Sequence, residues 1–158
     1  MRDDGFALHV VPIDELAVFT TGKSRAAKAA AEEFQDRAMD LARRGRAAGI
    51  ILLAATQRPS TDIVPSSLRS QFPYRWAFRC GAPEDSDTIL GRRWAARGWS
   101  TDTVDAADRG VGLLRHQGKT PVRLRAFHLS DDQIKAIAAR AEQLRRPVLE
   151  PAVEGRPA

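Results

Sequence analysis

The sequence predicts an α/β fold built on a parallel sheet, and three features of the chain indicate it. Residues 50–55 (IILLAA) are six apolar residues in a row, which is typical of a strand buried on both faces. A second apolar segment, LHVVPIDE, ends in the acidic pair Asp14 and Glu15. Between the two strands, residues 24–48 carry alanines at helical spacing. Buried strands that deliver polar side chains to the loops after them favour a nucleotide site at the carboxyl edge of the sheet.

The composition fits a single domain. The chain has 158 residues, 43% of them hydrophobic and 28% charged, which is enough for one core and too few for two. The net charge of +5 and the pI of about 10.1 fit a polyanion partner. The cations are mostly arginines, however, which a GC-rich coding genome would explain equally well.

Cysteine and apolar content predict a cytoplasmic location. Cys80 is the only cysteine, so no disulfide framework or cysteine metal site is expected, and a reducing compartment is the default. No apolar run approaches membrane-spanning length, and the first residues, MRDDGF, do not resemble a signal peptide. We therefore expect no membrane segment in this chain.

The remaining elements follow from local patterns. A long helix is expected from Ser24 to about Ala48, with Gly49 as its natural stop before the strand at 50–56. The sequence of the second half predicts a short helix at 63–71, a strand at 74–80 and a brief helix at 86–90 after Pro83. An irregular stretch at 91–109 and a hairpin of 111–115 with 121–127 are expected next. Ser130 is expected to cap a final helix, which carries on one face Ile134, Ile137, Ala138 and Leu144. Residues 1–146 are expected to form the domain and residues 147–158 a disordered tail.

The polar side chains after the two buried strands are the candidate catalytic residues. Asp14 and Glu15 stand where a nucleoside triphosphatase places the acid that holds Mg²⁺ through water and the acid that polarises the attacking water. An acid pair there also commonly caps the next helix. Gln57 ends the second strand, where its amide could bond the catalytic water and the γ-phosphate, or satisfy loop backbone.

Three arginines are candidates for contacts with phosphate. Arg58 and Arg69 follow the second strand and would contact phosphates of DNA or remain solvated surface. Arg46, in the last helical turn, complements the helix dipole or acts as a finger that reaches a neighbouring subunit's nucleotide.

Residues Ala17–Ser24 (AVFTTGKS) fit a loosened phosphate-loop pattern, in which alanine replaces the first glycine of GxxxxGK[ST]. The preceding acids would then crowd the triphosphate. Val18 and Phe19 are also bulky where backbone amides should wrap the phosphates. A small NTPase that uses this segment is kept as one alternative.

Several motifs together resemble the FtsK/SpoIIIE DNA translocase family. They are IDELA, the long helix ending in RAAG, the strand leading into ATQRPSTDIV, then FPYRWAF and DSDTIL, in the family's order and spacing between Leu8 and Leu129. The resemblance covers only the second half of that family's motor domain. It implies a partial RecA-like P-loop NTPase sheet of three layers that lacks the Walker A strand, with a carboxyl-terminal hairpin and helix.

The resemblance also implies roles for the candidate residues. Asp14 and Glu15 correspond to the Walker B pair, with ATP and Mg²⁺ as cofactors, and Gln57 to the polar residue that senses the γ-phosphate. Arg46 falls on the arginine-finger position. Arg58 and Arg69 fall where the family has basic residues near the DNA channel.

Two departures modify this expectation. The segment before DSDTIL reads GAPEDSD where the family usually has basic residues, and residues 92–114 replace the family's LLGxGDM stretch, as in actinobacterial conjugative plasmid transfer proteins. The chain is thus expected to be part of an ATP-driven translocase of double-stranded DNA, to join a ring such as a hexamer or pair with an upstream Walker A half, and to be inactive alone. The alternative from a different class is a non-enzymatic remnant or regulatory subunit that joins a ring or binds DNA.

Overall fold

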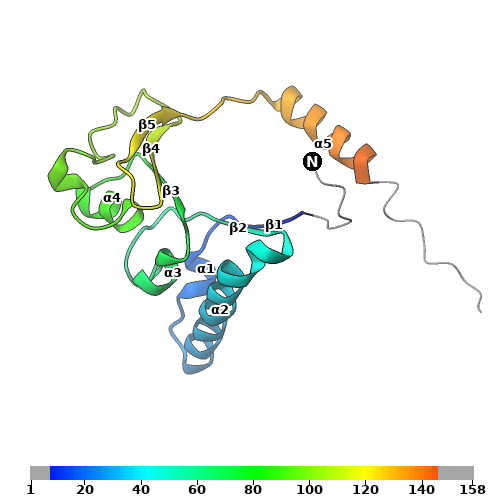
Figure 1. Cartoon of the computed structure of the whole chain (residues 1–158), viewed down its shortest axis with the longest axis horizontal. Coiled ribbons are helices and arrows are strands. Elements are labelled where there is room, and N and C mark those ends of the chain that lie inside the picture. Colours follow the sequence, from blue (N-terminus) through cyan, green and yellow to red (C-terminus); the bar gives the residue numbers. More distant parts are fainter. Residues whose placement is uncertain (1–7, 146–158) are drawn as a thin grey trace, which may run out of the picture. The chain divides into compact units, whose positions relative to one another are not determined.

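The computed structural model describes residues 8–145 (Figure 1). The chain divides into two compact units, Met1–Ala126 and Phe127–Ala158. The tail expected at 147–158 lies outside the described residues.

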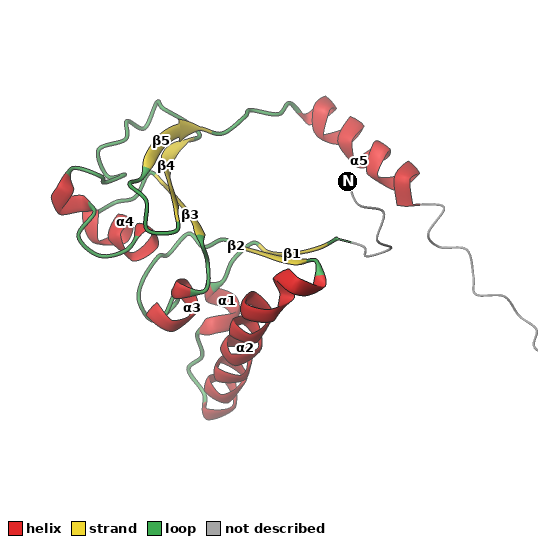
Figure 2. Cartoon of the chain, viewed as in Figure 1, coloured by secondary structure: helices red, strands yellow, loops and turns green. Residues whose placement is uncertain are grey.

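The predicted order of helices and strands is confirmed within the first unit (Figure 2). One short helix, α1, was not expected. The elements are β1 (His9–Ile13), α1 (Ala17–Thr20), α2 (Arg25–Arg44), the 3₁₀-helix η1 (Gly45–Ala48), β2 (Ile50–Ala54), α3 (Ser66–Ser70), β3 (Tyr74–Phe78), α4 (Pro83–Leu90), the 3₁₀-helix η2 (Ala95–Arg97), β4 (Val111–His116) and β5 (Val122–Arg125).

The strands form two sheets. β1 and β2 pair in parallel, with His9 opposite Ile50 and Ile13 opposite Ala54. β3, β4 and β5 form an antiparallel sheet in that order, which confirms the predicted hairpin. Each strand of the first sheet has one neighbour among the described residues, so each keeps one backbone edge unpaired.

Helix α2 begins where the sequence predicts, but it ends at Arg44, and the last predicted turn is the 3₁₀-helix η1. The Ser24 hydroxyl caps its start by accepting a hydrogen bond from the Ala27 amide at 3.1 Å. Gly49 adopts φ 71°, a left-handed conformation that glycine allows, and so turns the chain from η1 into β2. Helix α2 packs against β2 and α3. Its Ala38 packs into a core with Leu16, Ile63, Val64 and Leu68.

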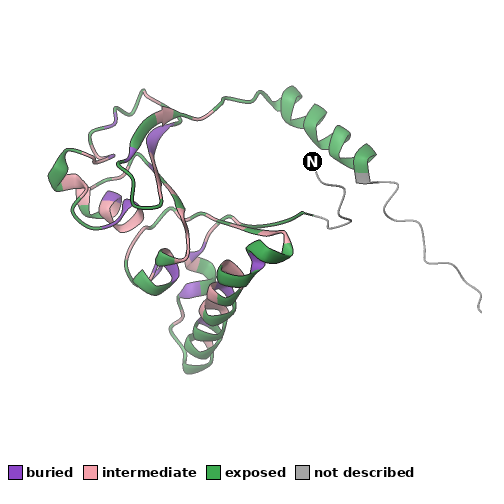
Figure 3. Cartoon of the chain, in the orientation of Figure 1, coloured by how far each residue is buried: buried purple, intermediate pink, exposed green. Residues whose placement is uncertain are grey.

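The expectation that β1 and β2 are buried on both faces is wrong for the described chain (Figure 3). Ile13, Leu52 and Ala54 pack against the core beside α2. On the other face, Val10, Ile51 and Leu53 remain 53%, 48% and 61% exposed. We call these three residues the open face. A parallel sheet needs cover on both sides to bury both faces, and residues 8–145 supply it on one.

A second, smaller core holds the antiparallel sheet. Ala77, Leu90 and Leu113 are its buried members, with Trp94 and Trp99 packed against them. Asp87 organises the adjoining loop: its carboxylate accepts the backbone amides of Arg93, Trp94 and Ala95 at 2.8, 3.0 and 2.9 Å. This acid, a departure from the family pattern, therefore has a structural role.

The second unit contains helix α5 (Asp131–Arg145). The predicted cap is confirmed, because the Ser130 hydroxyl accepts the Gln133 amide at 3.3 Å and the Gln133 side chain accepts the Ser130 amide at 2.8 Å. Ile134, Ile137 and Leu144, which were expected to share one face, are all exposed.

Candidate functional site

Three donors converge on the carboxylate of Glu15 just after β1. The Thr56 hydroxyl donates to Oε1 at 2.6 Å, and the backbone amide of Gln57 donates to Oε2 at 3.0 Å. The amide of Ala17 also donates to Oε1, at 3.1 Å. The glutamate of one strand end is thereby joined to the polar residues at the end of the neighbouring strand.

The parallel register creates this junction. Beyond the last strand pair, the Ala55 amide donates to the Ile13 carbonyl and the Leu16 amide donates to the Ala55 carbonyl, both at 2.8 Å. These bonds extend the ladder past the strands and bring Glu15 level with Thr56. Glu15 and Gln57 therefore lie together at one edge of the sheet.

The hydrogen bonds lower the pKa of Glu15. The Thr56 hydroxyl is the main cause, followed by the amides of Gln57 and Ala17. Glu15 is therefore an ionised carboxylate of low basicity at neutral pH. Such a group suits the orientation and polarisation of a water better than the storage of a proton.

Asp14 and the side chain of Gln57 remain available at the same edge. Both residues are exposed, and within residues 8–145 no hydrogen bond or ion pair engages either side chain. No cluster of three or more His, Cys, Asp or Glu gathers in that range. A single free carboxylate fits Mg²⁺ held through water, with phosphate oxygens as further ligands, rather than a cage built by the protein.

The first half of the segment 17–24 does not offer free backbone amides. Residues 17–20 are helical, and the amides of Val18, Phe19 and Thr20 donate to the carbonyls of Glu15 and Leu16. The Ala17 amide is taken by Glu15. A phosphate loop needs free amides that point to the ligand. The bonds of residues 17–20 therefore count against the alternative of a small NTPase that uses this segment, which stays a prediction.

Arg46 lies at the other end of the sheet from Glu15. It precedes β2 in η1, whereas Glu15 follows β1, and the strands run in parallel. At about 3.3 Å per residue, the five register pairs separate the two strand ends by about 13 Å. Arg46 is exposed and lines a groove. None of the residues that line this groove belongs to the Glu15 junction.

The side chains of Arg58 and Arg69 differ in exposure and in hydrogen bonding. The exposed Arg58 donates its backbone amide to the Thr56 hydroxyl at 3.2 Å, which helps to fix that hydroxyl toward Glu15. The half-buried Arg69 donates from Nη1 to the carbonyl of Thr88 at 2.6 Å. Burial, and secondarily Arg92, lowers the pKa of Arg69.

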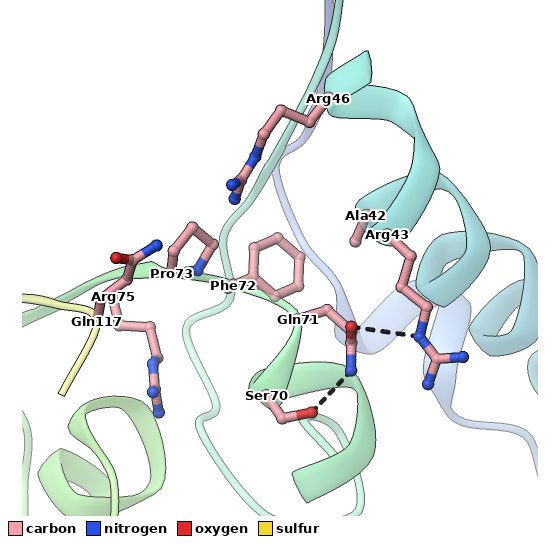
Figure 4. Close-up of a pocket in the computed structure, with 9 residues that line it drawn as sticks. All are labelled: Ala42, Arg43, Arg46, Ser70, Gln71, Phe72, Pro73, Arg75 and Gln117. Carbon is pink, nitrogen blue, oxygen red and sulfur yellow. Dashed lines mark hydrogen bonds between the residues drawn. The ribbon is translucent and has the colours of Figure 1, made fainter. Parts of the chain in front are cut away.

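The groove beside Arg46 was not expected from the sequence (Figure 4). Its volume is about 420 Å³. It is lined by Ala42, Arg43, Arg46, Ser70, Gln71, Phe72, Pro73, Arg75 and Gln117. These residues come from three separate segments of the chain, so no local motif could reveal the groove.

Known proteins resemble this chain in sequence over most of its length. It is 34% identical over 131 residues to the "DNA translocase FtsK" of Lactococcus lactis subsp. cremoris, a region that covers 82% of this chain and 15% of that protein. The FtsK of Bacillus cereus is 35% identical over 129 residues, 81% of this chain and 14% of the relative. The chain thus spans only a small part of these relatives. No family model matches it.

Two solved structures share the fold. The pCW3 conjugation coupling protein TcpA, in its monomer form with ATPgS, superposes with a TM-score of 0.66 at 25% identity, over 87% of this chain and 38% of TcpA. The cytoplasmic domain of the Thermomonospora curvata type VII secretion ATPase EccC gives 0.59 at 22% identity, over 78% of this chain and 12% of EccC.

The α/β fold is therefore that of P-loop ATPase domains. The resemblance to the FtsK/SpoIIIE DNA translocase family is confirmed by the curated relatives. None of the helices in residues 8–145 combines the length and apolarity needed to span a membrane.

Proposed function

We propose that this chain is part of an ATP-driven translocase of double-stranded DNA. In this proposal the chain supplies the residues that act on the attacking water and on Mg²⁺, and another segment supplies the phosphate loop. The observation that carries this proposal is the junction of Glu15 with Thr56 and Gln57 at the ends of two parallel strands. Similarity to FtsK over 82% of the chain supports the assignment.

The residues of the junction divide the chemistry among them. Asp14 would hold Mg²⁺ through water, and the bound metal would neutralise charge on the phosphates. Glu15 is held in one orientation by its three donors and would polarise the attacking water. Gln57 keeps its side-chain amide free to contact that water and the γ-phosphate.

Arg46 would act on the nucleotide of a neighbouring subunit. Its place at the opposite end of β1 and β2 from Glu15 favours action between copies over action within one copy. The family resemblance assigns this position to an arginine finger in a ring. Arg58 and Arg69 would contact DNA phosphates. Arg58 is the more exposed of the two, whereas Arg69 donates to the carbonyl of Thr88. A cytoplasmic location follows from this role.

The phosphate cradle is expected from another polypeptide segment. The amides of residues 17–20 are occupied, and β2 keeps one unpaired edge beside which a further parallel strand can add. We therefore expect the chain alone to hydrolyse no ATP. An upstream segment with a phosphate loop would complete both the sheet and the site.

The test combines the chain with such an upstream segment and measures ATP hydrolysis with and without duplex DNA. DNA-stimulated hydrolysis is expected only in the mixture. Glu15→Gln should abolish it, and Glu33→Gln, the same chemical change on the exposed face of α2, should not. Hydrolysis by the chain alone would refute the shared cradle. Unchanged hydrolysis in the mixture with Glu15→Gln would refute the role of Glu15 and favour a passive subunit.

A further inference from the structure

The two oxygens of the Glu15 carboxylate are occupied unequally. Oε1 accepts two hydrogen bonds, from the Thr56 hydroxyl at 2.6 Å and from the Ala17 amide at 3.1 Å. Oε2 accepts one, from the Gln57 amide at 3.0 Å. An ionised carboxylate has about four acceptor sites, shared equally by its two oxygens. Among residues 8–145, the donors therefore fill Oε1 and leave one acceptor site on Oε2.

The hydroxyl of Thr56 has a single proton, and its surroundings direct that proton to Glu15. The Arg58 amide donates to the hydroxyl oxygen at 3.2 Å. Two acceptors lie within reach of the proton, Glu15 Oε1 at 2.6 Å and the Arg58 carbonyl at 3.5 Å. A charged acceptor at a short distance makes the stronger bond. The hydroxyl thus holds Oε1 toward the residues that follow β2.

The remaining acceptor site lies beside Gln57. Because Oε2 already accepts the Gln57 amide, a molecule bonded to the same oxygen is close to this residue. The side chain of Gln57 is exposed and makes no hydrogen bond within residues 8–145. One water can therefore bond Oε2 and the side-chain amide of Gln57 at the same time. No comparable place exists at Oε1, whose two sites are taken.

We propose that Thr56 is a positioning residue of the hydrolytic site: it fills Oε1 and leaves Oε2 as the oxygen of Glu15 that bonds the attacking water. This inference rests on the proposed function and adds to it the oxygen that acts. The two oxygens are chemically equal, so only their surroundings distinguish them. Without the hydroxyl, Glu15 keeps its two backbone donors, and a free site opens on Oε1, away from Gln57.

The first test measures DNA-stimulated ATP hydrolysis by the full chain mixed with an upstream segment that carries a phosphate loop. Thr56→Val should lower kcat by about tenfold or more, as expected for a lost hydrogen bond to a charged group. The KM for ATP should stay nearly unchanged, because Thr56 does not contact the nucleotide in this proposal. Thr56→Ser keeps the hydroxyl and should retain most of the rate. Thr103→Val removes a hydroxyl bonded to the Ser100 carbonyl and is the matched control.

The pH dependence of kcat gives a readout that a general loss of structure would not shift. Glu15 must be ionised to polarise water, and the Thr56 hydroxyl is the main cause of its lowered pKa. The acid limb of the profile should therefore move to higher pH in Thr56→Val and stay in place in Thr56→Ser. A kcat in Thr56→Val equal to that of the wild type, or an acid limb that does not move, would overturn the proposal.

The second test needs no hydrolysis. In NMR spectra of the full chain alone, nuclear Overhauser contacts between the Glu15 γ protons and the amide protons of Ala17 and Gln57 report the orientation of the carboxylate. These contacts should weaken in Thr56→Val and persist in Thr56→Ser. Unchanged contacts in Thr56→Val would overturn the positioning role even where the mixture hydrolyses ATP.

The two tests separate this inference from the function on which it rests. A wild-type mixture that hydrolyses ATP, loses activity with Glu15→Gln and is unaffected by Thr56→Val would refute the role of Thr56 alone. A wild-type mixture without any hydrolysis would refute the proposed function and, with it, the role of Oε2.

Discussion

The hydroxyl of Thr56 donates a 2.6 Å hydrogen bond to the carboxylate of Glu15, across the ends of two parallel strands. The sequence separates these residues by 41 positions, and the register brings them together. This contact helps to orient Glu15 and is the main cause of its lowered pKa.

Thr56→Val should raise the pKa of Glu15 toward its ordinary value. The valine keeps the shape of the side chain but removes the hydroxyl, which is the main cause of the lowered pKa. The measurement is an NMR titration of the Glu15 carboxyl carbon. Thr103→Val, which removes a hydroxyl bonded to the Ser100 carbonyl, should leave that pKa unchanged. An unshifted Glu15 in the Thr56 variant would mean that the amides alone determine its ionisation.

Glu15 should stabilise the fold at neutral pH and lose this effect in acid. Its pKa is lower in the folded state than in the unfolded chain, so its contribution is present above the unfolded value and disappears as the pH falls through the folded value. Urea unfolding at about pH 7 and about pH 3 should therefore show a larger gap between the wild type and Glu15→Gln at the higher pH. A gap that does not change with pH would contradict this.

The open face of β1 and β2 should promote association. Val10, Ile51 and Leu53 form an exposed apolar patch next to unpaired strand edges. The chain expressed alone should associate or precipitate, and Leu53→Lys should reduce this in sedimentation velocity. Val18→Lys changes an equally exposed residue outside the patch and should have little effect. A monodisperse wild-type monomer that melts cooperatively would contradict this prediction.

Asp87→Ala should destabilise the region around the antiparallel sheet of β3, β4 and β5 by about 1–3 kcal/mol, because three backbone amides lose their acceptor. Trp94, whose amide is one of the three, should report the change by a shift in tryptophan fluorescence during urea unfolding. Glu84→Gln, in the exposed first turn of the same helix, should be close to neutral. Equal stability of the two variants would show that water replaces the carboxylate.

Gly112→Ala should destabilise the fold by about 1–3 kcal/mol through overpacking. A Cβ at this position would overlap the Ala77 carbonyl oxygen and lie 2.8 Å from Trp76 Nε1, and the backbone oxygen cannot move aside cheaply. Gly81→Ala meets no atom closer than 4.0 Å and is the matched control. Chemical unfolding of both variants measures the difference. Similar stabilities would mean that the antiparallel pair shifts to admit the methyl group.

The elements with strong local signals could be predicted from the sequence. Ser24 and Gly49 marked the ends of the long helical segment, and the apolar runs located both parallel strands. Asp14, Glu15 and Gln57 could be singled out as candidate site residues because these polar residues directly follow those runs. Such signals depend only on neighbours along the chain, so they can be interpreted without knowledge of the packing.

The rest depended on contacts between distant segments. Thr56 gave no separate signal, because its partner is determined by the register. The groove combines Arg43, Arg75 and Gln117, which only the packed chain brings together. The exposure of Leu53 also could not be predicted, since burial of an apolar strand depends on what covers it.

The position of Glu15 and Arg46 at opposite ends of β1 and β2 bears on how copies could meet if the arginine of one copy completes the glutamate site of another. In a two-fold dimer, the pair would be made twice across one interface that includes both ends of the strands, because residue i of each copy then contacts residue j of the other. In a head-to-tail arrangement, the two ends belong to different surfaces and each copy makes the pair once with each neighbour. Repetition of the head-to-tail contact either closes as a ring or continues as a helical filament, and the angle between successive copies decides which.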